Sequence, residues 1–452
     1  DQMRAEHSQL QLRHFLRAGS FDVTTTVYRN GFARNWYKLQ SVNGSSIAAI
    51  LDAPDGAADA LAVLRGADSD AGALRVRANN REYVARGIQT SIGLATRALG
   101  GHALEVGARF HQDEEDRFQH EDAYTMSSGA MVLNAAGTPG SQANRVSRAD
   151  AWSFFVQDRV ELGRLTLSPG VRYETIDFVR TDYAPGDAAR SAPTAERTND
   201  VQVWIPGMGA SFAAAADLRI FGGVHRGFAP PGPGADQETK PERSINYEVG
   251  TRLTRDRLGV QAVGFFSDYS NILGAETLAS GTDGTGDLFN GGAVHAWGVE
   301  LAGDYELVPG RGLWRLPLHT AYTFTRATFQ NGFESDYDPW GTVVAGDELP
   351  YLPGHQLYVR SGVERGPLSG SLTATYTSAM RAVAGQGALR ADDSTDDVFV
   401  LAASAEYRPV SSLVVYAGVQ NLTDAVHVVA RRPAGARPGL PRTVQVGVRV
   451  TR

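Results

Sequence analysis

The sequence predicts an all-β fold, a transmembrane antiparallel β-barrel, and three observations lead to this fold class. Runs of about ten residues alternate between apolar and polar side chains along nearly the whole chain. These runs occur in pairs joined by short polar turns. Long polar segments separate the pairs. Short turns on one rim and long loops on the other are typical of bacterial outer-membrane barrels.

The stretch from Lys240 to Leu307 shows this pattern most clearly. Two alternating runs meet at the turn Asp256-Arg257, a polar excursion follows, and a third run begins near Ala293. One face of this third run carries Ala293, His295, Trp297, Val299, Leu301 and Tyr305. Because strand side chains alternate between the two faces, Glu300, Asp304 and Glu306 share the opposite, hydrated face. The unit recurs along the chain, giving about 17 strands of the kind that outer-membrane barrels use.

Composition excludes several other classes of protein. The 452 residues are 42% hydrophobic, but the least charged stretch, residues 203–216, is interrupted by Pro206 and two glycines. A transmembrane helix needs about 20 apolar residues, whereas a barrel strand needs only about 9–11. The net charge of −7 argues against a nucleic-acid partner, and the absence of cysteine excludes disulfides and thiolate metal sites. A soluble β-sandwich or propeller is the alternative, but its connections would not alternate so regularly in length.

Four two-residue turns are predicted to lie together on the periplasmic rim. They are Gly100-Gly101, Gly163-Arg164, Asp256-Arg257 and Gly366-Pro367. Residues 35–80 are predicted to form a long insertion on the opposite rim, with weak helices at 47–51 and 57–64. A girdle of aromatic side chains on the lipid-facing side is expected to contain Trp152, Trp297, Tyr305, Tyr322 and Tyr376.

The parity of the strands leads to an expectation about the ends of the sheet. The first run precedes a short turn and the last run follows a long loop, so both should run toward the periplasm. An antiparallel barrel that closes on itself usually has an even number of strands. We therefore expect residues 1–452 to be a single barrel domain from which an odd number of strands is missing.

Several segments resemble the barrel of TonB-dependent outer-membrane receptors, and in particular the ferric-citrate and siderophore group. They occur in order along the chain at residues 21–42, 79–93, 221–231, 240–252, 346–357 and 421–450. The resemblance implies a barrel of the 22-stranded type, present here as a partial barrel of about 17 strands that lacks the plug domain and the first strands. The ending Val450-Thr451-Arg452 departs from the aromatic terminus common in such barrels.

The resemblance also implies a function. The protein would be a monomeric receptor in the outer membrane of a Gram-negative bacterium, importing an iron(III) chelate, ferric citrate or a siderophore. Its implied partners are the TonB complex, outer-membrane lipid and lipopolysaccharide, and no cofactor is expected. An importer of cobalamin or a carbohydrate, a passive porin and an outer-membrane enzyme remain as alternatives. An enzyme would need a convergent catalytic group, and no nucleophile–base pairing stands out in the sequence.

Binding of an anionic ferric chelate calls for guanidinium groups near the outer mouth, because they meet oxyanions in a bidentate manner. The polar candidates near predicted outer strand ends or in loops are Arg180, Arg226, Asn271, Arg381, Gln420, Arg431 and Arg432. The pair Arg431-Arg432 is favoured, since both guanidiniums belong to the last long loop. The competing interpretation is that each arginine is a solvated loop charge or contacts lipopolysaccharide.

One further run of ionisable residues could hold a metal ion. It consists of His111, Asp113, Glu114, Glu115, Asp116, His120 and Glu121. The spacing does not match a helical metal motif or a calcium-binding loop. The sequence therefore favours a flexible, exposed loop at this position over a metal site.

Overall fold

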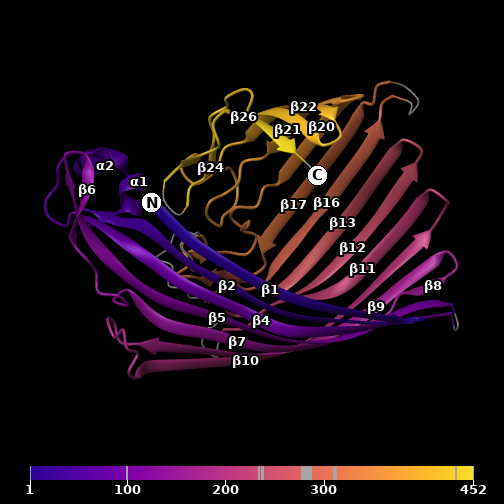
Figure 1. Cartoon of the computed structure of the whole chain (residues 1–452), viewed down its shortest axis with the longest axis horizontal. Coiled ribbons are helices and arrows are strands. Elements are labelled where there is room, and N and C mark those ends of the chain that lie inside the picture. Colours follow the sequence, from indigo (N-terminus) through magenta and orange to yellow (C-terminus); the bar gives the residue numbers. More distant parts are fainter. Residues whose placement is uncertain are drawn as a thin grey trace.

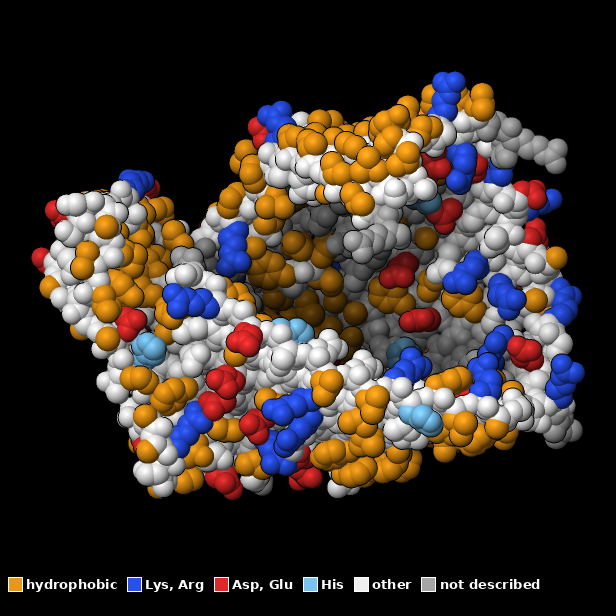
Figure 2. All heavy atoms as spheres, in the orientation of Figure 1, with side chains coloured by type: hydrophobic (Ala, Val, Ile, Leu, Met, Phe, Trp, Pro, Cys, Tyr) orange, Lys and Arg blue, Asp and Glu red, His pale blue; other side chains and the backbone are white. Residues whose placement is uncertain are grey.

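The computed structural model describes residues 2–97, 100–232, 235, 239–275, 288–308, 313–432 and 435–450. Its main element is one 20-stranded antiparallel sheet that curves into an open wall (Figure 1). Figure 2 shows the molecule hollowed where the sheet curves around its inner face. In the described part of the chain, no helix is long and apolar enough to cross a membrane.

Three members of the sheet are short, namely β3 (Ser45–Ser46), β6 (Ala130–Ala135) and β8 (Val160–Leu162), which leaves 17 long strands and confirms the predicted number. The long strands of the first half are β1 (Gln2–Ala18), β2 (Phe21–Val42), β4 (Leu74–Thr96), β5 (Gly101–Ser127), β7 (Ala143–Gln157), β9 (Leu165–Tyr183), β10 (Pro193–Ala213) and β11 (Leu218–Ala229). Those of the second half are β12 (Glu242–Arg255), β13 (Leu258–Asn271), β16 (Val294–Glu306), β17 (Pro317–Phe329), β20 (His355–Arg365), β21 (Leu368–Thr377), β22 (Val398–Val410), β23 (Leu413–Gln420) and β26 (Thr443–Val450). Short ribbons at the rim pair β14 (Leu273–Ala275) with β15 (Leu288–Asn290), β18 (Phe333–Glu334) with β19 (Thr342–Val343), and β24 (Val428–Ala430) with β25 (Arg437–Pro438).

The short turns lie on one rim, as predicted. Each long strand pairs antiparallel with its neighbours in chain order, so the turns Gly163-Arg164, Asp256-Arg257 and Gly366-Pro367 fall on the same side (Figure 1, right). The fourth predicted turn, between β4 and β5, lies on this rim too, but its predicted bounds are wrong, because Gly101 is already the first residue of β5 and pairs with Glu161. The link between β4 and β5 spans residues 97–100, of which 98 and 99 lie outside the described residues.

The insertion after β2 is shorter than predicted. The alternating pattern continues through β2 to Val42 and resumes in β4 at Leu74, so only residues 43–73 lie between the two long strands. This segment contains both predicted helices, α1 (Ile47–Asp52) and α2 (Ala58–Leu64), with a 3-10 turn η1 (Pro54–Gly56) between them. Ile50 and Val63 pack on the end of the wall against a core that also contains Val42, Leu74 and Met126. Figure 1 shows this cap at the left, beyond the ends of β2 and β4.

The acidic, histidine-containing run is not a loop, which corrects the sequence prediction. Residues 111–121 lie inside β5, a strand of 27 residues, and pair with both β4 and β7. The strand is stable there because neighbouring elements supply opposite charges, for example Arg81 to Glu115 and Arg190 to Asp116. Among the described residues there is no group of three His, Asp or Glu that could hold a metal ion.

The outward face of the wall carries a continuous apolar band. Across the first five long strands, direct cross-strand neighbours are Leu12, Val27, Ile88, Phe110 and Trp152. These side chains point away from the hollow, and Leu12 is 72% and Trp152 48% exposed. The register places all five predicted girdle residues on this same face, which confirms their position. In a bilayer such a face is covered by lipid.

The sheet does not close on itself within the described residues. There β1 hydrogen-bonds only with β2, and β26 only with β23. Since the 17 long strands alternate in direction, β1 and β26 run the same way, as the parity argument predicted. At the long-loop rim the backbone NH of Gly435 donates to the carboxylate of Asp52 over 2.9 Å, which links the last long loop to α1.

Close approach between β16 and its neighbours depends on Gly298. A side chain there would collide with the carbonyl oxygen of Phe324 and with the ring of Phe265. We expect Gly298→Ala to lower the free energy of unfolding by about 1–3 kcal/mol, because the paired backbones would have to separate. Gly264→Ala is the matched control, since Gly264 has open space around it. Thermal denaturation followed by circular dichroism should show a lower transition only for Gly298→Ala; equal behaviour of both variants would contradict the close packing.

Candidate functional site

A cavity of about 790 Å³ lies inside the wall at the long-loop rim. Inward-facing residues of three neighbouring strands form one side of it: Tyr269 of β13, Val294 of β16 and Ala327 of β17. Residues of the long loops form the other side, namely Tyr337, Pro339, Trp340, Leu349, Pro350, Tyr351, Leu352, Ala430, Arg432 and Arg437. We refer to this cavity as the mouth pocket.

Trp340 organises the apolar part of the mouth pocket. Only 7% of its surface is exposed, and its ring meets Phe329, Phe333 and Tyr337 at centroid distances of 5.9, 5.8 and 5.0 Å. All three contacts are edge-to-face, the arrangement that aromatic quadrupoles favour. The β14–β15 ribbon can lie close to Trp340 because Gly274 has no side chain. A Cβ atom at this position would meet the indole ring. The result is a rigid aromatic wall at the outer end of the lumen.

The polar groups of the pocket come from its rim. The Nη1 atom of Arg432 lies 3.3 Å from the Asp338 carboxylate, and 26% of the Arg432 side chain is exposed. On the strand side, burial and the nearby Glu242 carboxylate raise the pKa of Tyr269, which lies beyond the apolar band. The phenol therefore stays protonated and keeps its ability to donate a hydrogen bond. A pocket with an aromatic wall and a guanidinium at its edge suits a ligand with an apolar or aromatic body and negative charge.

Of the two favoured arginines, only Arg432 faces the pocket. Arg431 points the other way, and its guanidinium donates to the backbone carbonyls of Ser394 and Ala391. Its backbone NH donates to the hydroxyl of Tyr351 over 3.1 Å. Arg431 thus fastens the last long loop to two other loops, while Arg432 remains directed at the cavity.

Three other candidates also lie at the long-loop rim. Arg381 is largely buried and donates from Nε to Glu348 over 3.1 Å and from Nη2 to the Gly387 carbonyl. The amide of Asn271 donates to the carbonyl oxygen of Lys240 and to the side chain of Asn290, both over 3.2 Å. Gln420 is the exposed last residue of β23. Arg381 and Asn271 therefore use their donors within the protein.

The remaining two candidates lie on the wall itself. Arg180 is on the inner face of β9, where its guanidinium pairs with Asp182 at 2.7 Å. Arg226 lies on the outward face of β11 and donates to the carbonyl oxygen of Trp204 over 3.1 Å. The structure does not bring the seven candidates together, and Arg432 alone among them lines the mouth pocket. The aromatic wall around Trp340 was not predicted from the sequence, although the tryptophan within the polar loop DYDPWG was a usable signal for it.

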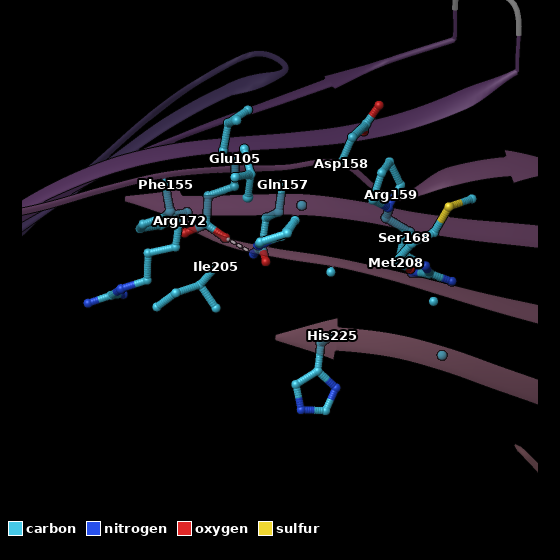
Figure 3. Close-up of a pocket in the computed structure, with 18 of the residues that line it drawn as sticks. Glu105, Phe155, Gln157, Asp158, Arg159, Ser168, Arg172, Ile205, Met208 and His225 are labelled. Atoms are coloured by element: carbon cyan, nitrogen blue, oxygen red, sulfur yellow. Dashed lines mark hydrogen bonds between the residues drawn. The ribbon is translucent and has the colours of Figure 1, made fainter. Parts of the chain in front are cut away.

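A second hollow of about 750 Å³ lies on the wall toward the short-turn rim (Figure 3). It exists because Gly170, Gly207, Gly209 and Gly223 leave the backbone bare on neighbouring strands. Its polar side chains bond among themselves, as Gln157 does with Glu105 over 2.8 Å. This surface has no opposing side, so the mouth pocket is the better candidate site.

Comparison with known proteins places this geometry in a family. Residues 4–422 match the family model described as TonB dependent receptor-like, beta-barrel. The pesticin receptor of Yersinia enterocolitica is 28% identical over 197 residues, which are 42% of this chain and 26% of that protein. The chain thus matches about a quarter of that relative's length.

Two solved structures share the fold. The unliganded ferric citrate transporter FecA superposes with a TM-score of 0.71 at 16% identity, covering 99% of this chain and 61% of that one. The siderophore receptor PiuA from Acinetobacter baumannii gives 0.73 at 14% identity, covering 99% and 64%. Together with the match over residues 4–422, the curved wall and the apolar band show that the chain belongs to the family of TonB-dependent receptor β-barrels.

Proposed function

We propose that the protein acts in the outer membrane as a receptor that takes up an anionic iron(III) chelate in a TonB-dependent manner. The observation that carries the proposal is the mouth pocket, in which Arg432 stands at the edge of an aromatic cavity on the inner face of a barrel of this family. Ferric chelates formed by hydroxycarboxylates or siderophores present oxyanions, which guanidinium groups bind in a charge-assisted manner.

The pocket geometry supports binding at this position rather than on the open wall. Trp340, Tyr337 and Leu349 exclude water from one side of the pocket, so an ion pair with Arg432 is screened less than at a flat surface. Arg432 already contacts Asp338, so a bound anion would compete with this carboxylate. The two solved structures that share the fold are named as a ferric citrate transporter and a siderophore receptor, so an iron(III) chelate is the first ligand to test.

The partners in the proposal belong to the whole protein. Energy for release of the ligand would come from the TonB complex, acting through a plug domain in the barrel. The apolar band would contact outer-membrane lipid, and the arginines above it, including Arg226, would contact lipopolysaccharide. The receptor would work as a monomer.

Removal of the Arg432 guanidinium is expected to weaken ligand binding. A charge-assisted bidentate contact contributes about 1.5–3 kcal/mol, so Arg432→Ala should raise the Kd for a ferric chelate about ten- to a hundredfold. Arg432→Lys should have a smaller effect, because lysine keeps the charge but loses the planar fork. The measurement is equilibrium binding of iron(III) citrate and of a siderophore chelate to the purified chain.

Arg390→Ala provides the matched control, since Arg390 lies in a long loop, is 74% exposed and does not line the pocket. Unchanged affinity of Arg432→Ala, or an equal loss in both variants, would exclude Arg432 as a ligand contact. Binding of cobalamin or a carbohydrate in place of the ferric chelates would favour a different imported ligand, and binding of none of them would favour a porin.

Arg431 is expected to act on loop order rather than on charge recognition. Arg431→Ala removes the donors to the Ser394 and Ala391 carbonyls, so residues 391–394 and 428–432 should exchange their amide hydrogens faster. Arg432→Ala keeps these hydrogen bonds and should leave the exchange of residues 391–394 unchanged. Hydrogen exchange with mass spectrometry distinguishes the two variants; equal protection in both would show that Arg431 does not hold the loops together.

A further inference from the structure

The upper end of β5 is part of a tight β-hairpin. After Ser127 the chain turns through Ser128 and Gly129, whose φ angles are 51° and 79°, and returns along β5 as β6. Positive φ values at both central residues are typical of a type I′ turn, which matches the twist of the paired strands. Figure 1 shows β6 at the far left beside the cap, where Gly66 closely approaches Gly129. The hairpin therefore projects beyond the apolar band together with the cap.

The direction of the backbone groups in this hairpin follows from Met126 of β5. Its NH donates to the Ser69 hydroxyl over 2.9 Å, and its carbonyl oxygen accepts from the Ser69 NH over 3.0 Å. Both groups of Met126 thus point toward the segment that precedes β4. Because consecutive residues of a strand point their backbone groups to opposite sides, Thr125 is directed at β6, where Val132 is its partner.

The outer edge of β6, on the side away from β5, is consequently open. Val132 uses its NH and C=O toward β5, so the backbone groups of Met131 and Leu133 point outward. Among the described residues, β5 is the one strand that pairs with β6, and no backbone hydrogen bond reaches Met131 or Leu133 from any other segment. We refer to this side of the strand as the outer edge of β6.

Nothing in the local sequence protects this edge from further pairing. All six residues of β6 are exposed, with 46% of Met131, 52% of Val132 and 51% of Leu133 accessible to solvent. Residues 127–136 contain neither a charged residue nor a proline. Proteins usually place such residues on open edges, because unpaired NH and C=O groups beside apolar side chains can accept another strand. The outer edge of β6 has the properties of a site for strand addition.

The surroundings of the hairpin are acidic. Residues 43–73, which form the cap, contain one arginine and five aspartates, Asp52, Asp55, Asp59, Asp68 and Asp70. The carboxylate of Asp68 accepts a hydrogen bond from the NH of Ser128 over 2.6 Å, so this segment lies directly against the hairpin. Asp59 and Asp70 line the same hollow of the cap as Asp68. Figure 2 shows apolar side chains gathered on this lobe, at the left.

This charge decides between the possible partners of the edge. Pairing with β6 of a second copy would bring two acidic caps together, and like charges repel each other across an interface. A strand of six residues also offers much less surface than a stable dimer buries. A lipid surface that carries phosphates is disfavoured by the same negative charge. A basic polypeptide segment meets both features, because its backbone can pair with the edge and its cations can contact the aspartates.

We propose that the outer edge of β6 binds an extended, basic segment of another polypeptide as an additional β-strand. The NH and C=O groups of Met131 and Leu133 hydrogen-bond with the backbone of this segment, and its lysine or arginine side chains lie near the aspartates of the cap. The edge is far along the sheet from the mouth pocket on β13 to β17. The inference therefore depends neither on Arg432 nor on iron uptake.

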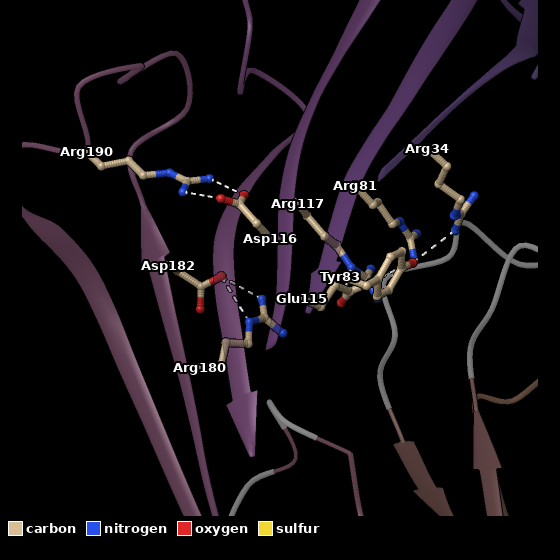
Figure 4. A network of polar contacts seen from close by, with 9 residues as sticks. All are labelled: Arg34, Arg81, Tyr83, Glu115, Asp116, Arg117, Arg180, Asp182 and Arg190. Atoms are coloured by element: carbon tan, nitrogen blue, oxygen red, sulfur yellow. Dashed lines mark hydrogen bonds and ion pairs between the residues drawn. The ribbon is translucent and has the colours of Figure 1, made fainter. Parts of the chain in front are cut away.

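The base of the hairpin is held in place before any partner arrives. Below the hairpin, Arg81 of β4 pairs with Glu115 of β5 at 3.1 Å, and Arg190 engages both oxygens of Asp116 (Figure 4). Above these ion pairs, Met126 is buried in the core of the cap. A rigid edge loses little conformational freedom on binding, which favours the addition of a strand.

The test is a titration of the whole chain, in micelles of a neutral detergent at low ionic strength, with a capped octapeptide of alternating lysine and valine. A glutamate–valine octapeptide tests the role of charge, and a lysine–valine octapeptide with every backbone nitrogen methylated tests strand pairing. We expect saturable binding of the first peptide that weakens in salt, and at least about tenfold weaker binding of the other two. Hydrogen exchange should show new protection of the Met131 and Leu133 amides in the complex.

Met131→Pro is the variant that blocks the edge. It removes the outward NH of residue 131 and keeps the bonds of Val132 to β5, so it should weaken binding of the lysine–valine peptide about tenfold. Met131→Thr is the matched control, because it loses the same side chain but keeps the NH and favours a strand, and it should bind nearly as the parent does. Replacing Asp59 and Asp70 together by asparagine should weaken binding about threefold.

Several results would overturn the inference. They are the absence of saturable binding, equal binding of the glutamate or the methylated peptide, and equal affinities of Met131→Pro and Met131→Thr. Protection of β1 or β26 in place of β6 would place the peptide elsewhere. Dimers of the parent chain that disappear in Met131→Pro would show that a second copy occupies the edge. If Met131→Pro lowers the melting temperature, the methylated peptide tests strand pairing on the parent chain.

Discussion

The constraint on which this structure depends is that every backbone NH and C=O group at membrane depth must be hydrogen-bonded within the protein. The long strands between β1 and β26 meet it by pairing antiparallel with a neighbour on each side, and side chains alternate between the two faces of the sheet. One face can then be apolar, as in the row from Leu12 to Trp152, while the other stays polar and lines the hollow. In the described chain, β1 and β26 are the long strands with a single partner.

Several strands of the first half are longer than a bilayer requires, and their extra length builds one side of the mouth. About 9–11 residues span a membrane, whereas β2, β4 and β5 contain 22, 23 and 27 residues. Their projecting ends support the cap around Ile50. On the other side of the hollow, loops between shorter strands fold over the wall and enclose the mouth pocket. The two parts of the mouth are thus built in different ways, one from sheet and one from loops.

Several arginines at the long-loop rim have fixed partners within the protein. Arg381, Arg431 and Arg190 have carboxylate or carbonyl partners that fix loops to the wall or to each other. Arg432 differs, since it lines the mouth pocket and pairs with the exposed Asp338 carboxylate at the edge of that cavity.

The sequence by itself determined the fold class, the number of long strands, the two helices of the insertion and the outward position of the girdle aromatics. These features depend on local periodicity and turn chemistry, which a single strand or hairpin already contains. Only the tertiary structure decided that residues 111–121 are a strand, because the charges that stabilise them, such as those of Arg81 and Arg190, come from distant parts of the chain. It also decided that Arg432 faces a pocket while Arg431 holds loops together. Cross-strand register and loop packing set these positions, and neither can be read from the spacing of residues along the sequence.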